Sequence, residues 1–185
     1  MVKIGTLEVR TVKTPMGRVK VVKLPGHEYP IEHFLPENYE RERKIGYNIL
    51  GKSRATYVTS RIGSKPTFVK KQSNLFGLSR LNPLSEVRLA THINALNIPG
   101  IKAEQPLAVI MHSTGAHSAI YRKLEGKMQT MLFEPTNAAK IRIELKKHGI
   151  IVGDLQWFAD KGQTTLFDLE YFGVSEVLRK KLGLK

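Results

Sequence analysis

The sequence predicts an α+β fold, with mainly antiparallel β-strands in the first two thirds and helices in the last third. Residues 1–24 alternate between apolar and mostly basic side chains on either side of a Pro-Met-Gly turn, a pattern typical of a β-hairpin. A second antiparallel pair is expected within residues 55–71, around a Gly-Ser turn. An Asn-Pro pair at residues 82–83, followed by apolar residues at helical spacing, indicates the start of a helix.

The remaining elements are expected from the same kinds of pattern. The helix of the last third is expected to begin at Thr136 as its cap and to be closed after His148 by Gly149. A proline-rich connection is expected at residues 25–36 and a short helix at residues 36–47. Strands are expected at residues 107–111 and 119–121, and two further short strands at residues 150–152 and 165–167. A final helix is expected at residues 174–182.

Length and composition place the chain among ordinary globular proteins. Its 185 residues are enough for one substantial core, and 41% of them are hydrophobic and 25% charged. No stretch approaches the roughly 20 apolar residues of a membrane span, and the first residues do not resemble a secretion signal. The absence of cysteine excludes disulfides and thiolate metal sites, so a cytoplasmic protein is expected.

Charge is the most informative property of the composition. The chain has 30 Lys and Arg against 16 Asp and Glu, a formal net charge of +14. A field of that sign concentrates polyanions, and nucleic acid is the commonest polyanion in a cell. The alternatives are solubility alone and attraction to acidic lipid, but no basic amphipathic helix of the membrane type stands out. The charge therefore favours nucleic acid as the partner.

Four short motifs occur in an order that suits phosphoryl transfer. They are ILGKSRA at residues 49–55, FVKK at 68–71, HGIIVGDL at 148–155 and TLFDLE at 165–170. Glu86 lies one turn into the helix that follows the second motif. The order is a turn of small residues, a strand ending in lysine, a helix with an early glutamate, and two aspartates that each follow a short apolar run.

These motifs resemble those of the small atypical kinases, namely the RIO family and the kinase of the KEOPS tRNA-modification complex. The resemblance implies a protein-kinase-like two-lobed fold, with a mainly antiparallel β amino-terminal lobe and a truncated helical carboxyl-terminal lobe. It divides the chain into a basic β-hairpin extension with a linker (residues 1–48), the amino-terminal lobe (residues 49–126) and a minimal carboxyl-terminal lobe (residues 127–185).

The resemblance also implies roles for individual residues, with ATP and Mg²⁺ as the bound ligands. Asp154 would accept the proton of the substrate hydroxyl, and Asp168 would hold Mg²⁺ against the phosphates. ATP would be bound by Gly51 and Ser53 of the phosphate-covering loop and by Lys70 of the third strand with its partner Glu86. The hinge would contribute Lys123, Leu124 and Glu125.

The chain also departs from the family pattern. The second metal ligand, an Asn in the family, falls on Ala159, with Gln156 or Asp160 as substitutes, and Val152 stands where histidine is usual. Little sequence follows Asp168, so a platform for peptide substrates is not expected. Trp157 and Phe158 are expected to be buried, with base stacking as the alternative.

The sequence therefore leads to one main hypothesis about function and two alternatives. The main hypothesis is an ATP-dependent RNA kinase that phosphorylates a ribose 2′-hydroxyl in tRNA, an acceptor that is implied by the resemblance to archaeal relatives of the KEOPS kinase. The first alternative is a Ser/Thr protein kinase or ATPase that acts on a ribosomal or tRNA-modification assembly. The second is a kinase-derived RNA-binding module without catalysis. The expected partners are ATP and tRNA or another structured RNA, with no membrane and no obligate protein partner deducible.

Overall fold

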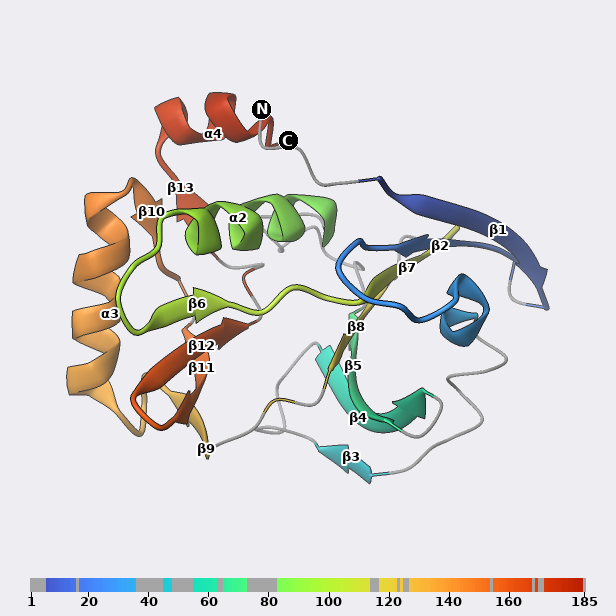
Figure 1. The fold of residues 1–185 in the computed structure, drawn as a ribbon, viewed down its shortest axis with the longest axis horizontal. Coiled ribbons are helices and arrows are strands. Elements are labelled where there is room, and N and C mark those ends of the chain that lie inside the picture. Colours follow the sequence, from blue (N-terminus) through green and yellow to red (C-terminus); the bar gives the residue numbers. More distant parts are fainter. Residues whose placement is uncertain are drawn as a thin grey trace. The chain divides into compact units, whose positions relative to one another are not determined.

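The computed structural model describes residues 6–15, 17–35, 45–47, 55–62, 65–72, 83–113, 117–122, 124, 127–153, 155–167, 169 and 172–184. For 45–47, 55–62, 65–72, 83, 117, 118 and 128 it describes the backbone alone. Within these residues the protein is α+β, with three α-helices and mainly antiparallel strands (Figure 1).

The chain divides into two compact units. The seven-stranded unit consists of Ile4–Leu78 and Pro106–Lys123, and the helical unit consists of Met1–Lys3, Ser79–Gln105 and Leu124–Lys185. This division groups the chain differently from the three segments expected from the sequence. The amino-terminal hairpin belongs with the strands of residues 106–123, and the helix after residue 82 belongs with the last third of the chain.

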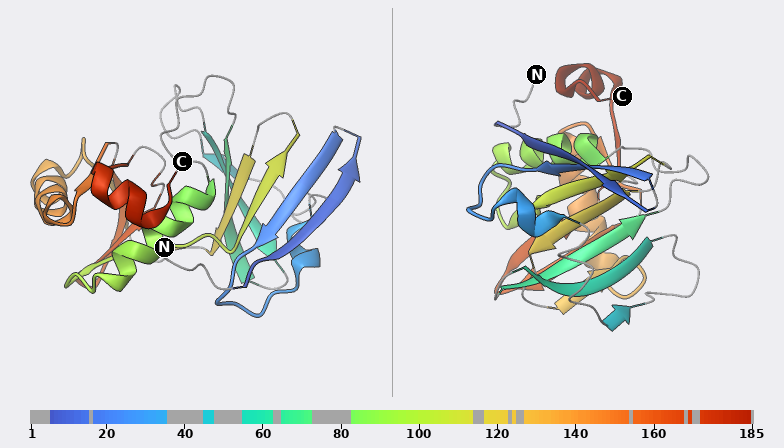
Figure 2. Two further views of the ribbon diagram at one scale, coloured as in Figure 1. Left: turned by 90° about the horizontal axis from the view of Figure 1, so that it is seen from above. Right: turned by 90° about the vertical axis from the view of Figure 1, so that its right-hand side faces the viewer.

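The seven-stranded unit contains one sheet in which every pair of neighbouring strands is antiparallel. Figure 2 shows its twist. The strands, in their order across the sheet, are β1 (Glu8–Thr14), β2 (Gly17–Lys23), β7 (Ala108–His112), β8 (His117–Arg122), β5 (Lys65–Gln72), β4 (Ala55–Ile62) and β3 (Ile45–Tyr47).

The expected amino-terminal hairpin is confirmed. β1 and β2 pair from Glu8 opposite Lys23 to Thr14 opposite Gly17, whose φ of 113° is the turn conformation that glycine adopts readily. Val19 and Val21 of β2 point into a core that is covered by the short 3₁₀ helix η1 (Ile31–Phe34). The hairpin therefore has one face packed on η1, as the alternation of its side chains requires.

The helical unit combines three helices with a four-stranded mixed sheet and a two-stranded ladder. The four-stranded sheet runs β6-β12-β11-β9, with β6 parallel to β12, and β10 pairs with β13. The elements, in chain order, are α2 (Pro83–Ala95), β6 (Ile101–Ala103), β9 (Lys127–Thr130), α3 (Pro135–Lys147), β10 (Ile150–Ile151), β11 (Gln156–Asp160), β12 (Gln163–Phe167), β13 (Gly173–Val174) and α4 (Glu176–Leu182).

One hydrophobic core joins these elements. The helices contribute a stripe of buried residues each, such as Leu89 of α2, Leu145 of α3 and Leu182 of α4. These side chains pack with Trp157 of β11 and Leu166 of β12. Because all three helices bury apolar side chains in the same cluster, the unit has a core of its own.

Several expectations about helix ends need correction. Thr136 does not cap α3, because the helix begins one residue earlier at Pro135, and proline suits the first turn, where its missing N–H is not needed. α4 begins at Glu176 rather than at Val174, because Val174 pairs in β13 and the Ser175 side chain accepts a hydrogen bond from the Leu178 N–H.

The short helix expected over residues 36–47 is wrong at its end, because Ile45–Tyr47 is β3 and pairs with β4. Residues 36–44 and the expected cap Asn82 lie outside the described residues. The strands β6, β9 and β11 were not expected from the sequence. Among the described residues, no helix combines the length and the apolar character needed to cross a lipid bilayer.

Candidate functional site

The predicted catalytic base Asp154 and the predicted metal ligand Asp168 belong to two connections of the helical unit. Both residues are outside the described part of the chain, but their described neighbours belong to paired strands. Asp154 stands between β10 and β11, and Asp168 stands between β12 and β13. The candidate site is therefore defined by the strands that flank these two connections.

The two connections join the same pair of strand ladders. At one end Ile151 of β10 is paired with Gly173 of β13, and at the other Gln156 of β11 is paired with Phe167 of β12. Paired residues of antiparallel strands have Cα atoms about 5 Å apart. The strand residues that flank one connection therefore lie beside those that flank the other, although β11 and β12 separate the two connections in the sequence.

The residue that follows each aspartate is anchored in the core. Leu155 is completely buried and Leu169 is 2% exposed, and both belong to the hydrophobic core of the helical unit. Trp157 is also buried in this core, which confirms the expected burial of that side chain. Phe158 is half-buried, with its ring 5.2 Å from that of Phe167.

Helix α3 contacts the connection that contains Asp154. The guanidinium of Arg142 donates a hydrogen bond of 2.8 Å to the carbonyl oxygen of Gly153, the residue before Asp154. Arg142 is not among the site residues expected from the sequence. Its signal was its place on α3, since Ile141 and Leu145 form the buried stripe and Arg142 falls on the exposed side.

The carboxyl end of α3 leads directly into β10. The N–H of His148 donates to the Leu145 carbonyl, and the N–H of Gly149 donates to the Lys146 carbonyl. Gly149 has a φ of 76°, and its carbonyl accepts a hydrogen bond from the Ser175 N–H ahead of α4. This turn therefore connects α3, β10 and α4 on the amino-terminal side of Asp154.

Of the predicted nucleotide-binding residues, Lys70 and Glu86 lie in described elements. The backbone of Lys70 is in the middle of β5, paired with Tyr57 of β4 and Ala119 of β8. Glu86 lies in the first turn of α2 and is 6% exposed. Because Lys70 belongs to the seven-stranded unit and Glu86 to the helical unit, their pairing stays a prediction.

The other predicted ATP contacts are mostly outside the described residues. Gly51, Ser53, Lys123 and Glu125 are not described, and Leu124 is described as half-buried. Their roles therefore stay predictions, as does the role of Asp168 in holding Mg²⁺. The described residues form no group of three or more His, Asp or Glu side chains that could hold a metal ion.

The position of the second metal ligand is occupied by a packing residue. Ala159 lies inside β11, paired with Thr164 of β12 and Lys127 of β9, and its methyl group packs against the core. The two residues named as substitutes are at the ends of the same strand, Gln156 at its start and the exposed Asp160 at its end.

Each unit contains a histidine with a lowered pKa. Burial lowers the pKa of His92 in α2, and the positive charges of Lys181 and His148 lower it further. Burial is also the main cause that lowers the pKa of His27 in the seven-stranded unit. Both side chains are therefore favoured in their neutral form.

Comparison with known proteins leaves the family open. No family model, no curated protein and no solved structure matches this chain.

Proposed function

We propose that this protein is an ATP-dependent kinase that transfers the γ-phosphate to a ribose 2′-hydroxyl of RNA, with tRNA as the acceptor. The observation that carries the proposal is the pairing of β10 with β13 and of β11 with β12. This pairing brings together the strand ends that flank the two connections to which Asp154 and Asp168 belong. A base for the acceptor hydroxyl and a carboxylate for the metal are needed within one site.

The order of the elements gives further support. β5 with Lys70 is followed by α2 with Glu86 in its first turn, then by β7 and β8, α3, and the two aspartate-bearing connections. This order resembles that of the small atypical kinases. The net charge of +14 supports a polyanionic acceptor.

In the proposed reaction, the carboxylate of Asp154 accepts the proton of the ribose 2′-hydroxyl. The 2′-oxygen forms a bond to the γ-phosphorus while the bond from that phosphorus to the β–γ bridging oxygen breaks, and ADP leaves. Mg²⁺, a hard cation that prefers carboxylate oxygen, would be held by Asp168 and would neutralise charge on the phosphates. The hydrogen bond from Arg142 to the Gly153 carbonyl orients the backbone that precedes Asp154.

The test is transfer of labelled γ-phosphate from ATP to total tRNA. Asp154→Ala is expected to lower transfer by about 10³-fold, because the base is lost. Glu176→Gln, which removes an exposed carboxylate at the start of α4, is the control and should keep the wild-type rate. Label on a 2′-oxygen blocks alkaline cleavage at that linkage, so it should be recovered in an alkali-resistant dinucleotide.

The position of Ala159 favours a second candidate, an RNA-binding module without catalysis. A methyl group packed in the core cannot ligate a metal. Under this alternative the protein binds tRNA but transfers no label, and its affinity for ATP does not depend on Mg²⁺. Tight binding of ATP that requires Mg²⁺, without transfer to tRNA, would instead direct the search to protein acceptors.

A further inference from the structure

One face of the β1–β2 hairpin carries three cations and a hydroxyl in the half that adjoins the turn. Lys13 of β1 is paired with Arg18 of β2, and Thr11 is paired with Lys20. Directly paired residues lie on the same face of a sheet, and so do residues two apart in one strand. All four side chains are exposed, and together they are called the basic hairpin face.

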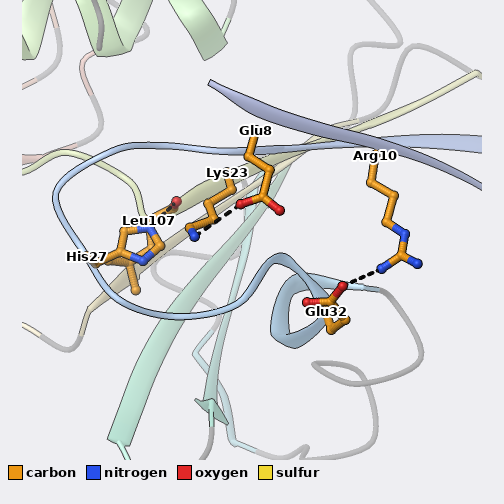
Figure 3. A network of polar contacts seen from close by, with 6 residues as sticks. All are labelled: Glu8, Arg10, Lys23, His27, Glu32 and Leu107. Carbon is orange, nitrogen blue, oxygen red and sulfur yellow. Dashed lines mark hydrogen bonds and ion pairs between the residues drawn. The ribbon is translucent and has the colours of Figure 1, made fainter. Parts of the chain in front are cut away.

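Charged side chains on the opposite face of the hairpin form two ion pairs. The Nζ of Lys23 lies 3.1 Å from a carboxylate oxygen of Glu8, and the guanidinium of Arg10 lies 2.6 Å from a carboxylate oxygen of Glu32 in η1 (Figure 3). The register separates these ion pairs from the basic hairpin face, because Glu8 and Arg10 alternate along β1 with Val9 and Thr11, whose side chains lie on the other face. Within the described residues, no carboxylate forms an ion pair with the three cations of the basic hairpin face.

The spacing of these cations suits a chain of phosphates. Arg18 and Lys20 are two residues apart, which is about 7 Å along a strand, and Lys13 lies across from Arg18 at about 5 Å. β1 is an edge strand of the sheet, so among the described residues no strand pairs with its outer edge. Three positive charges in this arrangement can contact successive phosphates without a change in the backbone of the hairpin.

The composition of the face identifies the kind of partner. A surface that inserts into a membrane interface combines its cations with a substantial apolar part, whereas Val9 is the only large apolar side chain that is exposed among the described residues of this hairpin. The described residues of the hairpin include no aromatic side chain, so base stacking is not available. Phosphate contacts without base contacts remain, and these position a nucleic acid without reading its sequence.

We propose that the basic hairpin face binds the phosphodiester backbone of the acceptor RNA. This inference deepens the proposed function and rests on it for the identity of the RNA. It gives the amino-terminal hairpin a role that differs from phosphoryl transfer, namely to hold the substrate by its backbone. The contacts are electrostatic, so they weaken with added salt and tolerate exchange of lysine and arginine.

The experiment measures the affinity of the full-length protein for a fluorescently labelled tRNA transcript between 50 and 400 mM KCl, a range chosen to span roughly one decade of salt. The triple variant Lys13→Gln/Arg18→Gln/Lys20→Gln is expected to bind about 100-fold more weakly near 0.1 M salt. Its plot of log K against log salt should be shallower by about 2 to 3, since each lost phosphate contact removes about 0.7 to 0.9.

The matched control removes three exposed lysines from the helical unit, Lys102, Lys127 and Lys161, as Lys102→Gln/Lys127→Gln/Lys161→Gln. It has the same net charge as the first variant and should bind within about threefold of the wild type. The variant Lys13→Arg/Arg18→Lys/Lys20→Arg keeps all three charges and should keep the wild-type affinity for the tRNA transcript. Thermal unfolding of each variant checks that a loss of binding is not a loss of fold.

Some results would overturn the inference. Equal losses in the two glutamine variants would mean that net charge, and not this face, binds RNA. An unchanged salt slope in the hairpin variant would exclude phosphate contacts there, and binding of the wild type to phosphatidylserine vesicles but not to tRNA would assign the face to lipid. Failure of the kinase proposal is distinguishable, since the wild type would then bind tRNA through the hairpin without transferring phosphate.

Discussion

His27 is surrounded by groups that keep its imidazole neutral. Its Nε2 donates a hydrogen bond of 2.8 Å to the Leu107 carbonyl (Figure 3), and its buried Nδ1 has no partner among the described residues. Burial lowers the pKa of His27 most, the hydrogen bond to Leu107 opposes it, and the charges of Lys23 and Arg122 lower it further. Protonation at Nδ1 would therefore place a charge where no acceptor is described.

This environment predicts a loss of stability in acid. The pKa of His27 in the folded protein is below 6.5, the ordinary value. As the pH falls through that value, the unfolded chain takes up a proton that the folded protein resists, so the free energy of unfolding decreases. Urea unfolding at a pH above and a pH below 6.5 measures this decrease.

His27→Gln, whose amide can still donate to the carbonyl, should lose part of the pH dependence of the wild type. His92→Gln tests the lowered pKa of the histidine in the helical unit in the same way. A pH dependence that neither substitution reduces would contradict the assignment.

Gly149 and Gly162 provide a second comparison at the scale of single residues. Both have positive φ, 76° and 81°, so alanine at either position is strained by about 1–2 kcal/mol. A Cβ at Gly149 would also lie 2.7 Å from the Oγ of Ser175, whereas a Cβ at Gly162 meets nothing within 4 Å.

Gly149→Ala is therefore expected to destabilise the protein more than Gly162→Ala. The Ser175 Oγ accepts a hydrogen bond from the Leu178 N–H at the start of α4, and loss of such a cap costs about 1 kcal/mol more. The free energy of unfolding in urea measures both variants. Equal losses would mean that Ser175 moves aside while its cap is kept.

At the scale of elements, helix α3 packs its buried side chains in the core of the helical unit and contacts the candidate site through an exposed side chain. Its exposed Arg142 donates to the Gly153 carbonyl, next to Asp154, and the same helix carries the exposed Lys140. Under the proposed function, Arg142 is a positioning residue, because it acts on the backbone before the catalytic base. Its loss should misplace that base without removing it.

Arg142→Gln is expected to lower kcat for transfer to tRNA by about 10-fold, because small displacements of a reacting group are costly. The KM for ATP and the Tm should change little. Lys140→Gln, which removes an equal charge from the same helix, should keep kcat. An equal decrease of kcat in the two variants would show that the charge of α3, and not the contact with Gly153, affects the reaction.

At the scale of the whole molecule, each unit has a core of its own. Leu145 is fully buried in the core of the helical unit, and Ile110 is fully buried in that of the seven-stranded unit. Truncation of either side chain to alanine is expected to cost about 2–5 kcal/mol, since it leaves a cavity.

Hydrogen exchange should report where each truncation acts. Leu145→Ala is expected to speed exchange in β10, β11 and β12, and Ile110→Ala in β2, β7 and β8, because local opening follows local contacts. Mass spectrometry of peptides from the two units makes the comparison. Faster exchange of both units to the same extent in each variant would indicate that the two cores unfold as one.

The elements that the sequence predicted correctly are those with a local signal. The β1–β2 hairpin is marked by alternating side chains and a Gly turn, and α2 by its Asn-Pro start and helical spacing. The missed strand β6 has three residues, and its parallel partner β12 lies about 60 positions later in the chain. The missed strand β11 has the sequence QWFAD, which shows no regular alternation of apolar and polar residues, and its partner β9 is also remote.

For the candidate site, the sequence predicted residue types and their order, but it could not predict which segments are neighbours. Asp154 and Asp168 were identified from the motifs around them. The pairing of Ile151 with Gly173 and of Gln156 with Phe167 brings together the strand ends that flank their connections. The contact of Arg142 depends on how α3 lies against the connection that follows β10.

The sequence by itself determined the α+β class, the amino-terminal hairpin and the strongly basic character of the protein, because these depend on composition and on patterns within a few residues. The tertiary structure decided which strands pair across long separations and which charges remain without a partner. Glu8 and Glu32 are neutralised by Lys23 and Arg10 because the register and the position of η1 bring them together. Such pairing follows from burial of remote apolar surfaces in a common core, and a local pattern does not contain that information.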